Sequence, residues 1–152
     1  MSKTPKPSTS RTFAAAAVIA ATGATRDDLI NWSRNGLLTV PLADSRPGKA
    51  RRYCAAGILE IALLKAMIER GSGFRLASDA IAEYVNTSTE PLDARSSLDT
   101  NAPHLFWAWH PSGDGDAFET TDDATALQWL CEGLVVVEIR SVVERALASI
   151  NA

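Results

Sequence analysis

The chain has 152 residues, of which 46% are hydrophobic and 22% are charged. This length permits one ordinary domain or two small ones, and the composition excludes wholesale disorder. The net charge of −3 is unevenly spread: residues 1–75 hold twelve Lys and Arg against five Asp and Glu, a net of +7, whereas residues 76–152 carry a net of −10. A basic half is typical of proteins that bind a polyanion such as nucleic acid. Chance segregation of charge is the alternative.

Cys54 and Cys131 stand in no redox or metal-binding spacing. We therefore expect no disulfide framework, no metal and no cofactor, and a reducing cytoplasm suits the chain. No apolar run reaches the about 18–20 residues that span a bilayer, so no membrane partner is expected. The basic N-terminus and the apolar run after it also imitate a secretory signal, an alternative that residues 13–24 leave open.

Residues 1–11 are rich in Pro, Lys, Ser and Thr and predict a disordered arm. The alanine-rich run over 13–21 favours a helix, with Thr12 as its N-terminal cap. Gly23 is expected to end this helix, because glycine adopts positive φ without steric cost.

A second helix is predicted over about 26–35. Thr25 is its expected cap, and two aspartates in its first turn suit the positive end of the helix dipole. Leu29 and Trp32 mark its buried side, and Gly36 ends it. Two helices joined by a glycine turn form the unit that many proteins insert into the DNA major groove.

The next segment predicts a β-hairpin with a basic tip. Leu37–Val40 has strand character, residues 44–50 contain the Pro and Gly of a turn, and residues 51–53 are expected to return as the second strand. A hairpin in this position, over about 38–53, would form the wing of a winged helix-turn-helix domain.

A helix over 54–70 is apolar nearly all round and is therefore expected to be buried on several sides. An amphipathic helix over 76–85 follows and completes a domain that spans residues 12–85. Residues 86–103 are polar and lack periodicity, so they predict a linker.

Residues 104–152 predict a small α+β domain of ββαβα order. A Trp-rich strand over 104–110 pairs with 116–121, and a helix capped by Thr121 precedes a β-branched strand and a terminal helix. Cys131 is expected to be buried, and Trp107 and Trp109 share one strand face that suits a core, an effector pocket or a dimer interface. The predicted fold is thus a mainly α N-terminal winged helix-turn-helix domain followed by this α+β unit.

Four short motifs carry a family resemblance: Thr22-Gly-Ala-Thr-Arg26, then Leu29, then Arg34-Asn-Gly-Leu-Leu38, then Arg51-Arg-Tyr53. Their order and spacing resemble the MerR family of winged helix-turn-helix DNA-binding proteins over roughly residues 12–85. Ile30-Asn-Trp-Ser33 replaces the family's Arg-Tyr-Tyr-Glu. The family's long dimerising helix and its metal-sensing cysteines have no counterpart here. Phage excisionases and small terminase subunits share the same plan.

Nine residues are candidates for contact with double-stranded DNA. Arg and Asn side chains can read guanine and adenine in the major groove, and basic wing residues can neutralise phosphates. Solvated surface positions are the alternative, and for the tyrosine, packing of the wing against the core. The candidates are Thr25, Arg26, Asn31, Arg34, Arg46, Lys49, Arg51, Arg52 and Tyr53.

The sequence carries none of the nucleophile, phosphate-loop or zinc motifs of common enzymes, so no catalytic residue is assigned. The predicted function is a sequence-specific transcriptional regulator, cytoplasmic and associated with the nucleoid. A homodimer is expected, formed through residues 104–152 or the helix over 54–70. The alternatives are a phage-type packaging or recombination accessory factor and a protein-interaction module that binds no DNA.

Overall fold

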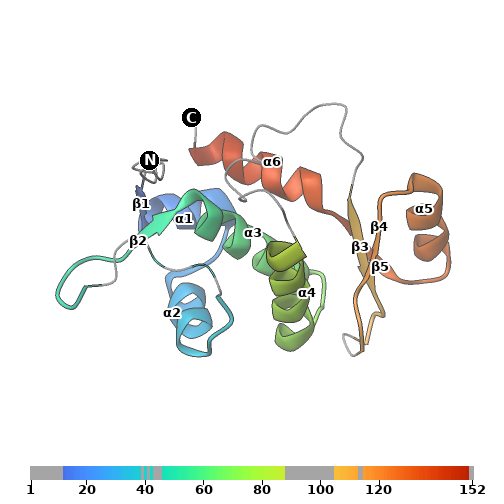
Figure 1. Cartoon of the computed structure of the whole chain (residues 1–152), viewed down its shortest axis with the longest axis horizontal. Helices are drawn as coiled ribbons and strands as arrows, with labels where there is room; N and C mark the ends of the chain where they lie inside the picture. Colours follow the sequence, from blue (N-terminus) through green and yellow to red (C-terminus); the bar gives the residue numbers. More distant parts are fainter. Residues whose placement is uncertain are drawn as a thin grey trace, which may run out of the picture.

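The computed structural model describes residues 12–38, 40, 42, 46–87, 105–112 and 115–150. Within these ranges the chain is mixed α/β, with six helices and two small antiparallel sheets (Figure 1). The elements in chain order are β1 (Thr12–Ala14), α1 (Ala15–Thr22), α2 (Arg26–Arg34), β2 (Arg52–Cys54), α3 (Ala55–Glu69), α4 (Phe74–Thr87), β3 (Phe106–Trp109), β4 (Phe118–Thr120), α5 (Asp123–Cys131), β5 (Val135–Glu138) and α6 (Ile139–Ile150). None of the helices described is both long and apolar enough to cross a membrane.

The predicted pair of N-terminal helices is present. Gly23 ends α1 with a φ of 74°, and its N–H donates to the carbonyl of Ile19 at 2.9 Å. Positive φ favours glycine here, because a Cβ would be strained. The prediction that Thr12 caps this helix was wrong: Thr12 lies in β1, and Ala14 holds the cap position without a side-chain hydrogen bond.

The predicted hairpin over 38–53 was also wrong for the residues described, while residues 39, 41 and 43–45 of that stretch lie outside them. The returning strand exists as β2, but it pairs with β1, in the register Thr12↔Cys54, Phe13↔Tyr53 and Ala14↔Arg52. This register places Phe13 opposite Tyr53, and both side chains are buried. Pairing with β1 therefore adds apolar burial to the backbone hydrogen bonds.

In the stretch Leu37–Val40, which was expected to form the other wing strand, two backbone N–H groups donate hydrogen bonds to residues of helices. The N–H of Leu37 donates to the carbonyl of Trp32 at 3.0 Å, and the N–H of Val40 donates to the Glu60 carboxylate at 3.1 Å. Glu60 lies on α3 and is buried. Leu37, Leu38 and Val40 lie in no strand.

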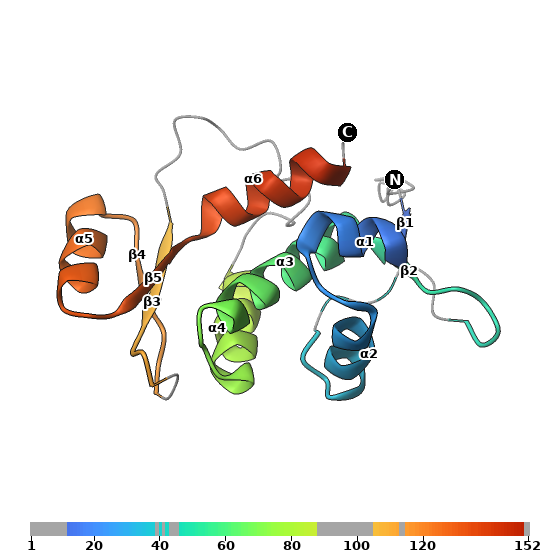
Figure 2. The same cartoon turned by 180° about the vertical axis from the view of Figure 1, so that it is seen from behind.

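Helix α3 is the centre of the molecule and is buried on most of its surface, as its composition predicted. The helices α1, α4 and α6 pack against it. Figures 1 and 2, which are opposite views, both show α6 running from the small sheet back towards α1. The buried apolar residues of both halves of the chain thus form one continuous core, which the predicted division at 86–103 did not anticipate. Helix α4 runs on to Thr87, and residues 88–103 of that segment lie outside the described residues, as does the arm 1–11.

The predicted ββαβα order of the C-terminal unit is confirmed. Its sheet has the order β4-β3-β5, with both neighbours antiparallel to β3. Trp107 and Trp109 are buried on the sheet, whereas Cys131 is exposed at the end of α5, against the prediction. Asp122, one residue after the predicted Thr121, caps α5 by accepting from the N–H of Ala124.

Candidate nucleic-acid interface

Helix α2 has two sharply different faces. Leu29 and Trp32 are each only 3% exposed and attach the helix to the core. Arg26, Asn31 and Arg34 are exposed, as the sequence predicted. The outer face therefore presents two guanidinium groups and one amide to the solvent, which are the groups that can read guanine and adenine edges.

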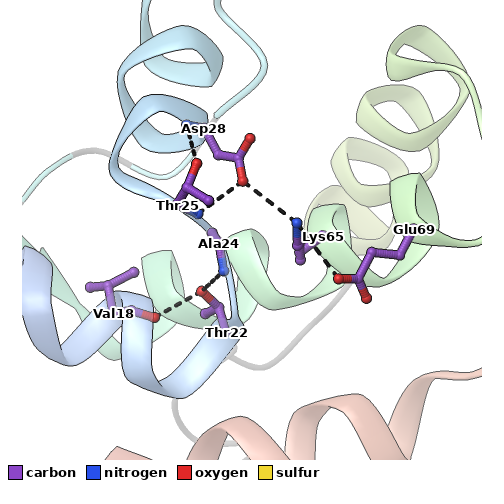
Figure 3. A network of polar contacts seen from close by, with 7 residues as sticks. All are labelled: Val18, Thr22, Ala24, Thr25, Asp28, Lys65 and Glu69. Carbon is purple, nitrogen blue, oxygen red and sulfur yellow. Dashed lines mark hydrogen bonds and ion pairs between the residues drawn. The ribbon is translucent and has the colours of Figure 1, made fainter.

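The start of α2 is held by a complete capping box (Figure 3). The Thr25 hydroxyl accepts from the N–H of Asp28 at 3.1 Å, and the Asp28 carboxylate accepts from the N–H of Thr25 at 2.9 Å. Two otherwise unpaired backbone donors are thereby satisfied. The Thr25 side chain therefore caps α2 and fixes the start of the helix from which the other candidates project.

The turn before α2 is tied to α1 and to α3. The hydroxyl of Thr22 donates to the carbonyl of Val18 at 2.8 Å and accepts from the N–H of Ala24 at 3.2 Å. On the other side, Lys65 of α3 places its ammonium 3.6 Å from the Asp28 carboxylate (Figure 3). The same ammonium lies 3.6 Å from the carboxylate of Glu69. The capped end of α2 is thus connected to the central helix.

This environment changes the acidity of Asp28. Partial desolvation taken alone raises the pKa of its carboxyl group. The hydrogen bonds with Thr25 and the nearby ammonium of Lys65 outweigh that effect, so the net pKa lies below the ordinary value. Asp28 is therefore firmly ionised at neutral pH, where its charge suits the N-terminal end of a helix.

The basic loop that precedes β2 is exposed at the end of the molecule opposite the small sheet (Figure 1). Its turn is closed by the N–H of Lys49, which donates to the carbonyl of Arg46 at 3.2 Å. The side chains of Arg46, Lys49 and Arg51 are exposed on it. Three cations on a protruding loop can contact a phosphate backbone without reading its sequence.

The remaining two candidates for DNA contact, Arg52 and Tyr53, have structural roles. Arg52 donates through Nη2 to the carbonyl of Thr12 at 3.0 Å, and through Nε and Nη2 to its hydroxyl at 3.2 and 3.1 Å. Tyr53 is only 4% exposed and belongs to the core, which is the packing alternative that the sequence left open. The structure therefore brings the predicted residues into two groups, one on α2 and one on the loop, and assigns these two to the β1–β2 pair.

One residue on the outer face of α2 was not among the candidates. Ile30 is 38% exposed, and it follows Arg26 by one helical turn and precedes Arg34 by another. Large exposed apolar side chains are uncommon in the described part of the chain. Its spacing of one helical turn from each of the two arginines was the signal in the sequence that could have identified it.

The chain was also compared with known proteins. No family model matches it, and no curated protein is significantly similar to it.

Proposed function

We propose that this protein binds double-stranded DNA and acts as a sequence-specific transcriptional regulator. The observation that supports this most strongly is the outer face of α2, where Arg26, Ile30 and Arg34 form one exposed stripe with Asn31 beside it. The opposite face is packed in the core, and the helix start is fixed by the capping box. A rigid helix with a polar outer face that can hydrogen-bond to bases is what major-groove reading requires.

In this proposal α2 lies in the major groove. Arg26 and Arg34 donate to guanine O6 and N7, and Asn31 pairs with adenine N6 and N7. Ile30, between the two arginines, is apolar and suits contact with a thymine methyl group. Asp27, also exposed in the first turn, restricts how closely the helix start can approach a phosphate.

The basic loop supplies affinity rather than specificity. Arg46, Lys49 and Arg51 contact phosphates beside the site read by α2. Arg52 contributes indirectly, because its hydrogen bonds with Thr12 hold the strand from which the loop extends. In this proposal the loop contacts phosphates as the wing was expected to, although β2, the strand that follows it, pairs with β1.

Self-association is part of the proposal. Helix α3 uses most of its surface inside the chain, so the helix over 54–70 offers little area for a second copy. Helix α5 instead exposes Leu127 by 62% and Leu130 by 57%. We place the homodimer contact there, with a twofold-symmetric operator and a location at the nucleoid in the cytoplasm.

The test is binding to random and genomic duplex fragments across a series of salt concentrations. The triple variant Arg26→Ala, Asn31→Ala, Arg34→Ala should lose sequence preference and keep weak, salt-sensitive binding. Loss of Arg51 should lower the slope of log K against log salt by about 1. Arg75→Ala is the matched control, because Arg75 is exposed on α4 and the binding should not change.

Two outcomes would contradict the proposal that this protein is a transcriptional regulator. Multimeric binding on repeated sites without sequence preference would favour a packaging or recombination accessory factor. Absence of binding to any duplex, even at low salt, would favour a protein-interaction module.

A further inference from the structure

A cleft of about 580 Å³ lies where α4 faces the small sheet. Trp107 lines it from β3, and Trp129 lines it from α5. The Trp107 ring is fixed edge-on by Tyr84 of α4, with the ring centroids 5.4 Å apart. The volume is in the range that accommodates small ligands.

Carboxylates stand on opposite sides of this cleft. Asp79 and Glu83 are one turn apart on α4, and Asp116 and Glu119 come from the sheet side. Glu119 pairs directly with Trp107 in the β3–β4 register, so both side chains occupy the same face of the sheet. The cleft therefore combines aromatic walls with negative charge from both sides.

The charged side chains among the described residues that line the cleft are all negative. No Lys, Arg or His is among the described residues that line it, and the sequence contains no Lys or Arg from residue 96 to residue 139. Arg75, one turn before Asp79 on α4, places its Nε 3.9 Å from the Asp79 carboxylate, and both side chains are exposed to solvent. The charged side chains among the described lining residues are therefore all carboxylates, which favours a positively charged ligand.

The walls favour an organic cation over a metal ion. Among the described residues, no three His, Cys, Asp or Glu side chains are grouped so that they can hold a metal. Because Trp107 is only 2% exposed, the aromatic surface open to a ligand is that of Phe118, which is 40% exposed, and of the partly buried Trp129. Aromatic ring faces attract ammonium groups. We propose that this cleft binds a small organic cation, with an amine or quaternary ammonium group on an apolar body. The proposal is independent of DNA binding by α2.

Calorimetric titration of the full chain with benzyltrimethylammonium tests the proposal. The comparison probe is 2,2-dimethyl-3-phenylpropan-1-ol, in which a carbon atom replaces the charged nitrogen and one of the three methyl groups carries a hydroxyl for solubility. We expect the cation to bind about tenfold or more tightly than the neutral probe, and to change the tryptophan fluorescence. Equal affinity for the two probes, or no binding of the cation at millimolar concentration, would refute the site.

Variants then locate the binding. Asp79→Asn combined with Glu119→Gln should weaken binding of benzyltrimethylammonium about tenfold or more. Asp123→Asn combined with Glu132→Gln removes the same charge from α5 outside the cleft, and it should change the affinity less than twofold. Equal losses of affinity in the two double variants would show a general effect of charge and would refute binding in the cleft. If thermal unfolding shows that the first double variant is not folded, its two single variants decide by the same comparison.

Discussion

The ammonium of Lys65 lies 3.6 Å from the Asp28 carboxylate that caps α2. This contact joins the central helix of the core to the first turn of the helix proposed to read DNA. Both side chains are partly shielded from solvent, so the pair is screened less than a fully exposed one. The orientation of α2 therefore depends on a residue far from its outer face.

The first prediction concerns pH. The folded-state pKa of Asp28 is below the ordinary value, so its contribution to stability is present above the unfolded pKa of about 3.9. The contribution is lost as the pH falls through the lower folded pKa. The difference in unfolding free energy between the wild type and Asp28→Asn should therefore shrink from pH 6 to pH 3 in urea titrations.

Asp27→Asn is the control, since Asp27 is exposed in the same turn and takes no part in the capping box. Asp122 also has a lowered pKa, because it accepts hydrogen bonds from the Thr125 hydroxyl and the Ala124 N–H. It is present in every protein compared, so its contribution cancels. A difference that stays constant over this range would show that Asp28 is not stabilised as described.

The second prediction concerns the cap. Thr25→Ala should lower the unfolding free energy by about 1 kcal/mol, because the N–H of Asp28 loses its acceptor. Thr25→Ser keeps a hydroxyl and should lose much less. Chemical unfolding followed by circular dichroism measures both, and equal losses would indicate that the methyl group of Thr25, not its hydroxyl, stabilises the helix start.

The third prediction separates two adjacent arginines. Arg52→Ala should destabilise the fold by about 0.5–1.5 kcal/mol, because its hydrogen bonds with Thr12 join β2 to β1. Arg51→Ala should leave stability within about 0.5 kcal/mol and weaken DNA binding at low salt. Unfolding and binding are measured on both variants. The opposite pattern would show that Arg52 is the phosphate contact.

The fourth prediction concerns Ile30. If Ile30 contacts a thymine methyl group, replacing that thymine by uracil in the DNA site that the protein prefers should weaken binding by about threefold to tenfold. The reason is that one methyl group is removed from an apolar contact. Ile30→Ala should bind both duplexes equally, whereas Ile30→Val should still discriminate between them. Sequence-specific binding without any response to uracil at every thymine would reject this contact and leave the wider DNA proposal standing.

The fifth prediction concerns self-association. Leu127→Glu combined with Leu130→Glu should convert a dimer to a monomer in sedimentation experiments, because it places charges in the apolar contact. Gln128→Glu, on the same helix, is the control and should leave the dimer intact. A double variant that sediments like the wild type would remove α5 from the proposed interface.

Local signals in the sequence predicted the elements that depend on nearest neighbours. The cap at Thr25, the left-handed Gly23 and the buried stripe of Leu29 and Trp32 are determined by residues within a few positions of one another. Backbone geometry and helical periodicity set these features, so they need no knowledge of the rest of the chain. The exposure of Arg26, Asn31 and Arg34 followed from the same periodicity.

Only the tertiary structure decided which strand β2 would join and what its residues would do. Arg52 and Thr12 are forty positions apart, and no local pattern in the sequence predicts the hydrogen bonds between them. The same holds for the carboxylate of Glu60, which accepts a hydrogen bond from the N–H of Val40, where a strand was expected. Strand pairing depends on which apolar faces can be buried together, and that choice is made by the whole core at once.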